Sequence, residues 1–199
     1  MENIFPQANK IKKENREKLL GQNAFLVWLT GLSGSGKTTL GNSLEYELNN
    51  RSYLTYMLDG DNIRSGLNSN LGFSNEDREE NIRRIGHVAN LFVDAGLITI
   101  AAFISPFKKE RQLAAKLVGK DRFIEVFVDC PLDVCIERDP KNLYKKALKN
   151  EIPDFTGISS PYEEPEDPGI VVDTSALSIE GSVEKIIKYL EDNDLIESK

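Results

Sequence analysis

Residues 24–38 read AFLVWLTGLSGSGKT, and this stretch decides the fold. Residues 24–30 are apolar up to the final threonine, which is typical of a parallel strand that is buried on both faces. Residues 31–38 match the pattern GxxxxGK[ST] of a phosphate-binding loop, or P-loop. The glycines let backbone N–H groups curl around phosphate oxygens, and the positive end of the next helix stabilises the same charge. The stretch therefore predicts a binding site for the phosphates of a nucleotide.

The P-loop supplies the candidate residues for binding ATP. We expect Lys37 to reach the phosphoryl group that is transferred and the Thr38 hydroxyl to bind Mg²⁺. The residues expected to contact the nucleotide here are Gly31, Leu32, Ser33, Gly34, Ser35, Gly36, Lys37, Thr38 and Thr39. A P-loop by itself does not separate kinases from GTPases, ATPases and motors. The chain has no NKxD guanine-reading motif, and its small size and single P-loop fit the nucleotide-kinase-like branch.

The rest of the chain alternates short apolar runs with longer amphipathic runs. Further strands are expected at 52–59, 97–105, 123–130 and 169–175, and helices at 37–50, 75–95, 107–119, 131–139 and 179–191. This alternation predicts an α/β fold of three layers, in which a parallel five-stranded sheet carries helices on both faces. Residues 140–168 show no clear strand, and we interpret them as a lid. Residues 1–199 are expected to form a single domain with an N-terminal arm over 1–22.

Composition excludes several classes of function. The net charge of −7 argues against a general nucleic-acid surface, which normally carries an excess of Lys and Arg. No apolar run is long enough to span a membrane, and the N-terminus lacks the apolar region of a secretory signal, so we expect a cytoplasmic protein. Cys130 and Cys135 are expected to be buried reduced thiols, and His87 a surface side chain. The chemistry is therefore expected from Asp, Lys, Arg and Ser.

Ligands of parallel sheets bind at the carboxyl ends of the strands, and candidate polar residues follow the second strand. Asp59 and Asp61 flank Gly60, where one carboxylate could accept a hydroxyl proton or orient Mg²⁺ through water. Arg64 follows, where it could meet an anionic substrate. The alternative is an Asp-Gly turn whose carboxylates only cap the backbone. The neighbouring P-loop favours the functional interpretation.

More candidates precede and follow the third strand. Ser74 has the character of a helix N-cap, and Arg78 and Asn81 lie one turn apart on the same face of the helix that follows. Phe73 is either a hydrophobic staple for this helix or a platform on which a base stacks. Ser105, at the end of the third strand, either caps the next helix or contacts a phosphoryl group. The sequence pattern leaves both alternatives open.

Several segments together resemble the adenylyl-sulfate kinase family. They are GLSGSGKTTL, DGDNIRSGLNSNLGFSNEDREENIRRIGHVANLFVDAGLITIAAFISPFKKER, FIEVFVDCPLDVCIERDPKNLYKKA and DFTGISSPYEEPEDP, in order between about residues 24 and 175. The DGDN, NIRRIG, ISPF and FTGI segments are more specific than the P-loop. This family phosphorylates the ribose 3′-hydroxyl of adenosine 5′-phosphosulfate (APS) with ATP, which gives 3′-phosphoadenylyl sulfate (PAPS) and ADP. The resemblance implies a stand-alone, Mg²⁺-dependent kinase of sulfate activation.

The resemblance also implies a role for each matching residue. Asp61 would be the base or the Mg²⁺ organiser near the 3′-hydroxyl, and Asp59 would support the turn. The residues implied to hold APS are Arg64, Arg78, Asn81, the Ile104 backbone, Lys141, and the rings of Phe73 and Phe155 on the two faces of its adenine. Arg138 would flank the adenine of ATP. Ser105 matches a serine that is phosphorylated in some members, although direct in-line transfer is favoured here.

The chain departs from the family pattern at two places. Ser65 stands where the family often has His, and Thr38-Thr39 where Ser-Thr is common. A homodimer is a candidate assembly on the family resemblance alone. Two rival functions are a P-loop kinase of another nucleoside or small hydroxylic metabolite, and a non-catalytic regulator that binds nucleotide. The first would phosphorylate an acceptor other than APS, and the second would bind ATP without turnover.

Overall fold

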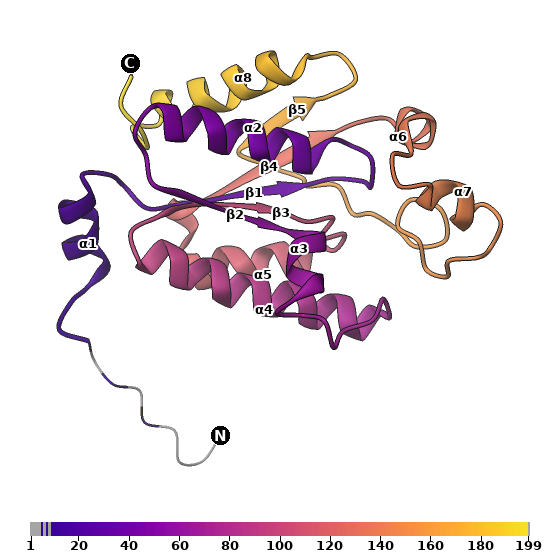
Figure 1. Cartoon of the computed structure of the whole chain (residues 1–199), viewed down its shortest axis with the longest axis horizontal. Coiled ribbons are helices and arrows are strands. Elements are labelled where there is room, and N and C mark those ends of the chain that lie inside the picture. Colours follow the sequence, from indigo (N-terminus) through magenta and orange to yellow (C-terminus); the bar gives the residue numbers. More distant parts are fainter. Residues whose placement is uncertain (1–4, 6, 8, 199) are drawn as a thin grey trace.

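The computed structural model describes residues 5, 7 and 9–198, and a five-stranded sheet lies at its centre (Figure 1). The strands are β1 (Leu26–Thr30), β2 (Thr55–Asp59), β3 (Ile98–Ala102), β4 (Phe123–Asp129) and β5 (Ile170–Asp173). They lie in the order β2-β3-β1-β4-β5, and every neighbouring pair is parallel. All residues of the central strand β1 are buried, as the apolar run predicted. The predicted parallel five-stranded sheet is confirmed.

Helices cover both faces of this sheet. They are α1 (Lys13–Leu20), α2 (Lys37–Asn50), α3 (Gly60–Ser65), α4 (Asn75–Asp94), α5 (Lys108–Val118), α6 (Leu132–Arg138), α7 (Leu143–Ala147) and α8 (Ile179–Asp192), with a 3₁₀ turn at Lys120–Arg122. Figure 1 shows α2 and α8 on one face and α4 and α5 on the other. This is the predicted three-layer α/β arrangement. None of the helices that the structure describes has the length and apolar character that crossing a bilayer requires.

Two apolar clusters hold the layers together, one on each face of the sheet. Val27 packs with Leu44 of α2 and its neighbours in one cluster. Trp28 packs with Ile85 of α4 and Ala114 of α5 in the other. Successive residues of a strand point to opposite faces, so β1 needs apolar side chains at every position. Burial of each large aliphatic side chain contributes roughly 1.5–3 kcal/mol, and the two clusters thereby fix the edge from which the P-loop projects.

The N-terminal arm contains a helix that the sequence analysis missed. Helix α1 is tied to the body by ion pairs of Arg16 with Asp94 and of Glu17 with Arg122. Figure 1 shows α1 at the end of the sheet that is opposite to the P-loop and α7. None of its residues is buried, so its sequence lacks the apolar periodicity from which a helix can be predicted. Residues 1–4, 6 and 8 of the predicted arm lie outside the described residues.

The third strand is shorter than predicted. Residues 97–105 read as one apolar run, but β3 ends at Ala102. The backbone then turns, and Ser105 has a φ of 39°, which is incompatible with a continued strand. The sequence could not show this, because the run stays apolar through Phe103 and Ile104. Phe103 lies after the end of the strand but is still buried, and its ring stacks on Trp28.

Candidate active site

The P-loop connects β1 to α2 at the carboxyl edge of the sheet, and its glycines are required there. Gly31, Gly34 and Gly36 have φ values of 156°, 75° and 93°, a region that other residues rarely adopt. A Cβ atom on Gly31 would lie 2.5 Å from the carbonyl oxygen of Val128, so a side chain at this position would displace the loop. The close packing of the loop against β4 therefore demands glycine. This explains in physical terms the motif that the sequence analysis found.

Lys37 is held inside the P-loop by backbone oxygens. Its Nζ donates to the carbonyl oxygens of Gly31 at 2.9 Å and Leu32 at 2.6 Å, and it lies 3.5 Å from the Ser35 hydroxyl. Burial lowers the pKa of the Lys37 amine to about 8, and the attraction of Asp59 opposes this shift only in part. A phosphate group in the loop would give this amine the counter-charge that it lacks.

The structure distinguishes the two acidic residues of the DGD segment. The Thr38 hydroxyl donates to Asp59 Oδ2 at 2.8 Å. The other oxygen of the buried Asp59 accepts the backbone N–H of Asp61 at 3.0 Å and of Asn62 at 3.4 Å, which caps α3. Asp61 lies in the first turn of α3, and its largely exposed carboxylate forms an ion pair with Lys141. Asp59, which was expected only to support the turn, is thus the carboxylate beside Thr38.

This corner could bind a hard cation jointly with phosphate oxygens. A hydroxyl and a carboxylate are oxygen ligands of the kind that Mg²⁺ prefers. Among the described residues, no group of three or more His, Cys, Asp or Glu side chains could hold a metal alone. The Thr38–Asp59 pair offers two such oxygens beside the P-loop, where nucleotide phosphates could supply others.

Two arginines gather positive charge on the acceptor side. The Arg64 guanidinium lies 4.6 Å over the ring of Phe73 and donates to the carbonyl oxygen of Gly72 at 2.8 Å. Arg78 donates to the carbonyl oxygen of Phe73 at 2.9 Å and to the Thr156 hydroxyl at 3.3 Å. Partial burial lowers the pKa of both guanidinium groups, and repulsion from Arg78 lowers that of Arg64 further. Two partly desolvated cations that repel each other favour an anionic ligand.

Asn81 points into the same region, but a second asparagine holds it. The buried Asn81 accepts a hydrogen bond from Asn68 Nδ2 at 2.9 Å. Asn68 is itself completely buried and accepts from Arg84 at 3.4 Å. Asn68 was not among the predicted site residues, because it lies in a polar loop whose composition predicts exposure. The pair presents Asn81 in a fixed orientation beside Arg78 on α4.

The two aromatic rings predicted to enclose an adenine lie in different surroundings. Phe73 is 65% exposed, whereas Phe155 is only 8% exposed. Phe155 packs edge to face on Tyr144 with ring centroids 5.0 Å apart, inside a small apolar cluster with Cys135 and Ala147. Arg78 connects the two segments, since it contacts both Phe73 and Thr156. Phe73 is therefore open to a ligand in this structure, and Phe155 is packed within the predicted lid.

Ser105 is enclosed rather than presented to solvent. Its side chain accepts from Trp28 Nε1 at 3.0 Å and donates to Thr30 Oγ1 at 3.1 Å, and the residue is 1% exposed. The Ile104 carbonyl oxygen accepts from Thr30 Oγ1 at 2.8 Å. A hydroxyl in this position supports the loop that carries it, and access for a phosphoryl donor would require the loop to open. The structure thus gives Ser105 a supporting place, and its catalytic role stays a prediction.

Arg138 lies on the nucleotide side, where Thr174 holds it. Arg138 donates to the Thr174 carbonyl oxygen at 2.6 Å and lies 3.3 Å from its hydroxyl. That hydroxyl donates to the Ser35 carbonyl oxygen at 2.8 Å, which links Arg138 to the P-loop. Thr174 was missed because it lay inside the predicted strand 169–175, whereas β5 ends at Asp173 and leaves Thr174 at the carboxyl edge of the sheet. Cys130 and Cys135 are free and buried nearby, as expected, and His87 is exposed.

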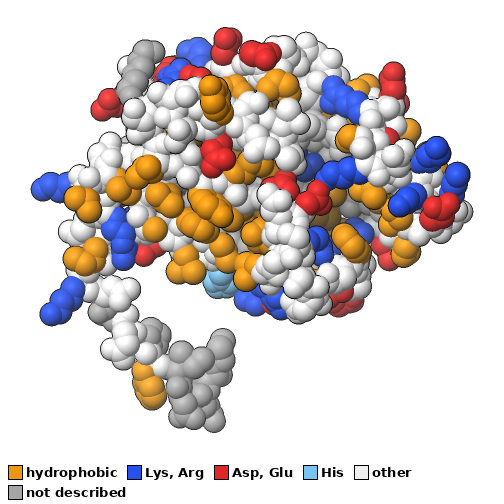
Figure 2. All heavy atoms as spheres, viewed as in Figure 1, with side chains coloured by type: hydrophobic (Ala, Val, Ile, Leu, Met, Phe, Trp, Pro, Cys, Tyr) orange, Lys and Arg blue, Asp and Glu red, His pale blue; other side chains and the backbone are white. Residues whose placement is uncertain are grey.

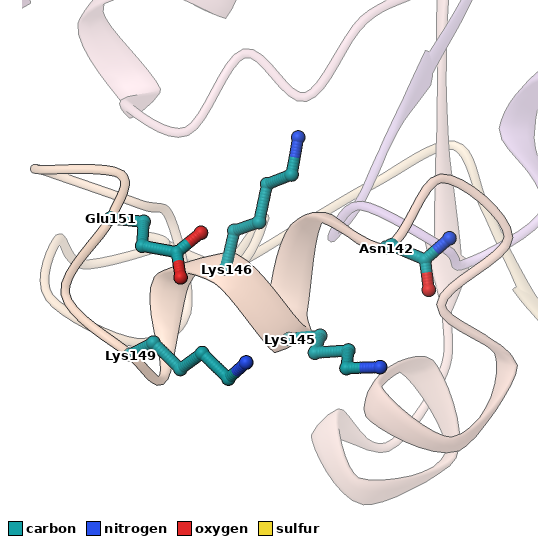
Figure 3. Close-up of a pocket in the computed structure, with 5 residues that line it drawn as sticks. All are labelled: Asn142, Lys145, Lys146, Lys149 and Glu151. Atoms are coloured by element: carbon teal, nitrogen blue, oxygen red, sulfur yellow. The ribbon is translucent and has the colours of Figure 1, made fainter.

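The predicted lid touches the P-loop directly. The Tyr144 hydroxyl donates to the Ser33 carbonyl oxygen at 2.9 Å. A hollow of about 500 Å³ lies between Leu32 and the segment 157–162. A second hollow of about 390 Å³, shown in Figure 3, is lined by Asn142, Lys145, Lys146, Lys149 and Glu151 around α7. The second contains none of the predicted site residues, whereas Leu32 of the P-loop lines the first.

Comparisons with known proteins agree with this geometry. A model of the adenylylsulphate kinase family matches residues 23–173. The adenylyl-sulfate kinase of Clostridium kluyveri is 60% identical over 188 residues, 94% of each chain, and that of Clostridium acetobutylicum is 56% identical over 194 residues, 98% of this chain and 96% of the relative. The Mycobacterium tuberculosis APS kinase CysC, solved in complex with AMPPNP and APS, is 45% identical with a TM-score of 0.81, covering 85% of this chain and 99% of that chain.

Proposed function

Because the chain belongs to the adenylyl-sulfate kinase family, we infer that it transfers the γ-phosphate of ATP to the ribose 3′-hydroxyl of APS, giving PAPS and ADP. One observation of the structure carries this inference. The Thr38–Asp59 hydrogen bond joins the P-loop to the start of α3, which carries Arg64 close enough to Arg78 for the two charges to repel, so a nucleotide triphosphate and a second anion can meet there. The local positive charge stands out in a chain whose net charge is −7.

On the ATP side we assign the phosphates to the P-loop and Lys37. On binding, the Lys37 amine would exchange the Gly31 and Leu32 carbonyl oxygens for phosphate oxygens. Mg²⁺ would be held by Thr38 together with phosphate oxygens, and Asp59 and Asp61 would orient its water ligands. The bound ion would offset the charge of the β- and γ-phosphates. Arg138, held by Thr174, would flank the adenine of ATP.

On the acceptor side we assign Asp61 as the group that takes the proton of the 3′-hydroxyl. Its ion-pair partner Lys141 would turn to the anionic APS and leave the carboxylate free for this task. Arg64 and Arg78 would hold the phosphosulfate, and Asn81 the sugar. Phe73 is exposed enough to stack on the adenine. Phe155 would complete the base pocket after leaving its contact with Tyr144.

We interpret residues 140–168 as a lid within a single domain of residues 1–199. Its contacts with Ser33, Asp61 and Arg78 support this assignment, because they connect the segment to both halves of the site. A closed lid would exclude water and thereby prevent simple hydrolysis of ATP. Movement of the lid should change the surroundings of residue 155, and the tryptophan fluorescence of a Phe155→Trp variant would report this change. Fluorescence that is unchanged on adding ADP and APS to a Phe155→Trp variant would contradict the assignment.

The decisive assay measures ADP and PAPS with four acceptor conditions: APS, AMP, adenosine and none. We expect equal amounts of ADP and PAPS with APS, and neither product when EDTA removes Mg²⁺. ADP formed only with AMP or adenosine would show a kinase of another nucleoside. Tight ATP binding without ADP under any condition would show the non-catalytic regulator. Each rival thus has its own result.

We also propose that the chain forms a homodimer through apolar side chains around the edge strand β2. Leu54, Tyr56 and Leu91 are exposed, and Tyr56 stacks on Phe92 of α4 with ring centroids 4.6 Å apart. Figure 2 shows orange side chains gathered on this face. Contiguous exposed apolar surface of this kind often marks a protein interface. Sedimentation equilibrium should give a dimer that Leu91→Lys weakens, and a monomeric wild type at micromolar concentration would exclude the proposal.

A cytoplasmic location is the last part of the proposal. Cys130 and Cys135 are free and buried, which suits a compartment that keeps thiols reduced. The reaction also consumes ATP, which is plentiful there. Recovery of the protein in a periplasmic or culture fraction of its host would contradict this location.

A further inference from the structure

We propose that Tyr162, Thr30 and Arg111 are positioning residues that fasten the C-terminal end of the lid to the loop at residues 104–106, so that only the part of the lid before Pro161 moves. The proposal rests on the proposed function, because it explains how a lid over this site closes in a reproducible position. Within the proposed lid of residues 140–168, it assigns residues 162–168 to a fixed end and the residues before Pro161 to the moving part.

Tyr162 is anchored through both its hydroxyl and its ring. The hydroxyl lies 2.9 Å from Thr30 Oγ1 at the end of β1. The ring stacks on Phe127 of β4 with centroids 6.1 Å apart, and the Arg111 guanidinium lies 5.9 Å from its centroid. Burial raises the pKa of the Tyr162 phenol to about 12, so the hydroxyl keeps its proton at neutral pH. Residue 162 is therefore attached to the central sheet.

Thr30 joins three segments through a single hydroxyl. It is completely buried and directly precedes Gly31 of the P-loop. Its one proton is donated to the Ile104 carbonyl oxygen at 2.8 Å, since a carbonyl can only accept. Tyr162 must consequently be the donor in its bond to Thr30, and Ser105 donates to the same oxygen at 3.1 Å. Thr30 Oγ1, at the start of the P-loop, is thus hydrogen-bonded both to the loop at residues 104–106 and to the C-terminal end of the lid.

Arg111 repeats the connection from the other side. This buried arginine of α5 donates to the carbonyl oxygens of Ser105 and Glu163, each at 2.8 Å. Its Nε is paired with Glu125 at 2.7 Å, which fixes the plane of the guanidinium. The backbone N–H of Glu163 donates to the Pro106 carbonyl oxygen at 2.8 Å. Both polar backbone groups of Glu163 are therefore held by the loop at residues 104–106 and its neighbour α5.

The remainder of the lid is attached in a different way. Its polar tethers are Lys141 to Asp61, the Tyr144 hydroxyl to Ser33, and Arg78 to Thr156, and Tyr144 and Phe155 also pack with Cys130 and Cys135 in an apolar cluster. Every polar partner outside the lid is a residue assigned above to ATP or APS, so substrate binding competes with each polar tether. The partners of Tyr162 and Glu163, by contrast, lie in the frame behind the site. Pro161, whose ring fixes φ, separates the two kinds of attachment.

A loosened anchor would lower the fraction of molecules whose lid closes correctly. The apparent affinity for APS falls with that fraction, because some of the residues assigned to APS lie on the lid and the others lie outside it. Water would also reach the γ-phosphate more often, so some ATP would be hydrolysed without forming PAPS. The ratio of ADP to PAPS therefore reports on the anchor, whereas a residue that only stabilises the fold would leave this ratio unchanged.

Tyr162→Phe is the sharpest test, because it removes the hydroxyl and keeps the ring on Phe127. We expect the KM for APS to rise about 2- to 10-fold, as the loss of one hydrogen bond implies. The ADP to PAPS ratio should exceed the wild-type value, and the melting temperature should change little. Tyr46→Phe is the matched control, since Tyr46 is 71% exposed on α2. A Tyr162→Phe enzyme with wild-type KM and ratio would overturn the proposal.

Thr30→Val gives an independent arm. Valine has the shape of threonine without its hydroxyl, so this variant should raise the ADP to PAPS ratio. Adding Tyr162→Phe should then change the ratio by less than about 1.5-fold, since both substitutions remove the same contact between Thr30 and Tyr162. A full second effect in the double variant would contradict the shared contact. PAPS formation by the wild type decides the proposed function separately from the anchor.

Hydrogen exchange tests the same boundary without any variant. On addition of ADP and APS, peptides within residues 140–160 should gain protection, and those within 162–168 should keep the protection they already have. Equal changes on both sides of Pro161 would refute the fixed end.

Discussion

Asp61→Ala is expected to lower the rate of phosphoryl transfer by roughly 10²–10⁴-fold, the range for loss of an acid–base group. A ribose hydroxyl is a weak nucleophile, and its proton needs an acceptor as the bond to phosphorus forms. Asp61 is the exposed carboxylate of the DGD segment, and its ion pair with Lys141 keeps it at the boundary between the lid and α3. MgATP binding should be nearly unchanged, because the P-loop does not depend on this side chain. Single-turnover PAPS formation measures the effect.

Two controls separate the proton acceptor from the ion pair. Lys141→Met breaks the same ion pair, but it should raise the KM for APS more than it lowers kcat. Asp61→Asn keeps the size of the side chain without a base, and should resemble Asp61→Ala. Near-normal turnover of Asp61→Asn would remove Asp61 from the proposed role. An equal loss of kcat in Lys141→Met would point to the ion pair itself.

Much of the fold was predictable because its signals are local. The strand β1, the P-loop and α2 follow from one continuous stretch of sequence, and α2 begins and ends at the residues expected. α3 was missed because its six residues are too few for a periodic pattern. α1 was missed because it buries no side chain. Local sequence therefore predicts elements that carry their own apolar pattern, and fails for those held by a few polar contacts.

The sequence predicted which residues form the candidate site, but not which of their side chains contact one another. The sequence DGD could not show which carboxylate faces Thr38. That choice follows from α3 beginning at Gly60, which makes Asp59 the cap and turns Asp61 toward the lid. Thr30 and Tyr162 lie 132 residues apart, and no local pattern relates them. Their pairing exists only once the sheet and the lid have been placed.

Lys37→Met is expected to lower phosphoryl transfer by about 10²–10³-fold or more, which is the scale for removing one electrostatic stabiliser of a transition state. The amine is buried among P-loop carbonyl oxygens, and the loop sequence GLSGSGKT at residues 31–38 contains no second Lys or Arg that could take its place. Methionine is unbranched like lysine and one atom shorter, and it removes the charge together with the N–H donors. Isothermal titration with MgATP, together with PAPS formation, would separate lost binding from lost chemistry.

The pH dependence provides the control for this prediction. Burial lowers the pKa of Lys37 to about 8, so kcat/KM for ATP should fall as pH rises through this value in the wild type. Lys37→Arg keeps the charge at any accessible pH, so whatever activity it retains should lack this decline. The unfolded chain binds the proton up to its ordinary pKa of 10.5, so the wild-type free energy of unfolding should rise between about pH 8 and 10.5. Lys37→Met should lack this rise. A wild-type kcat/KM that stays flat through pH 8 would show that Lys37 of the free enzyme does not lose its proton there.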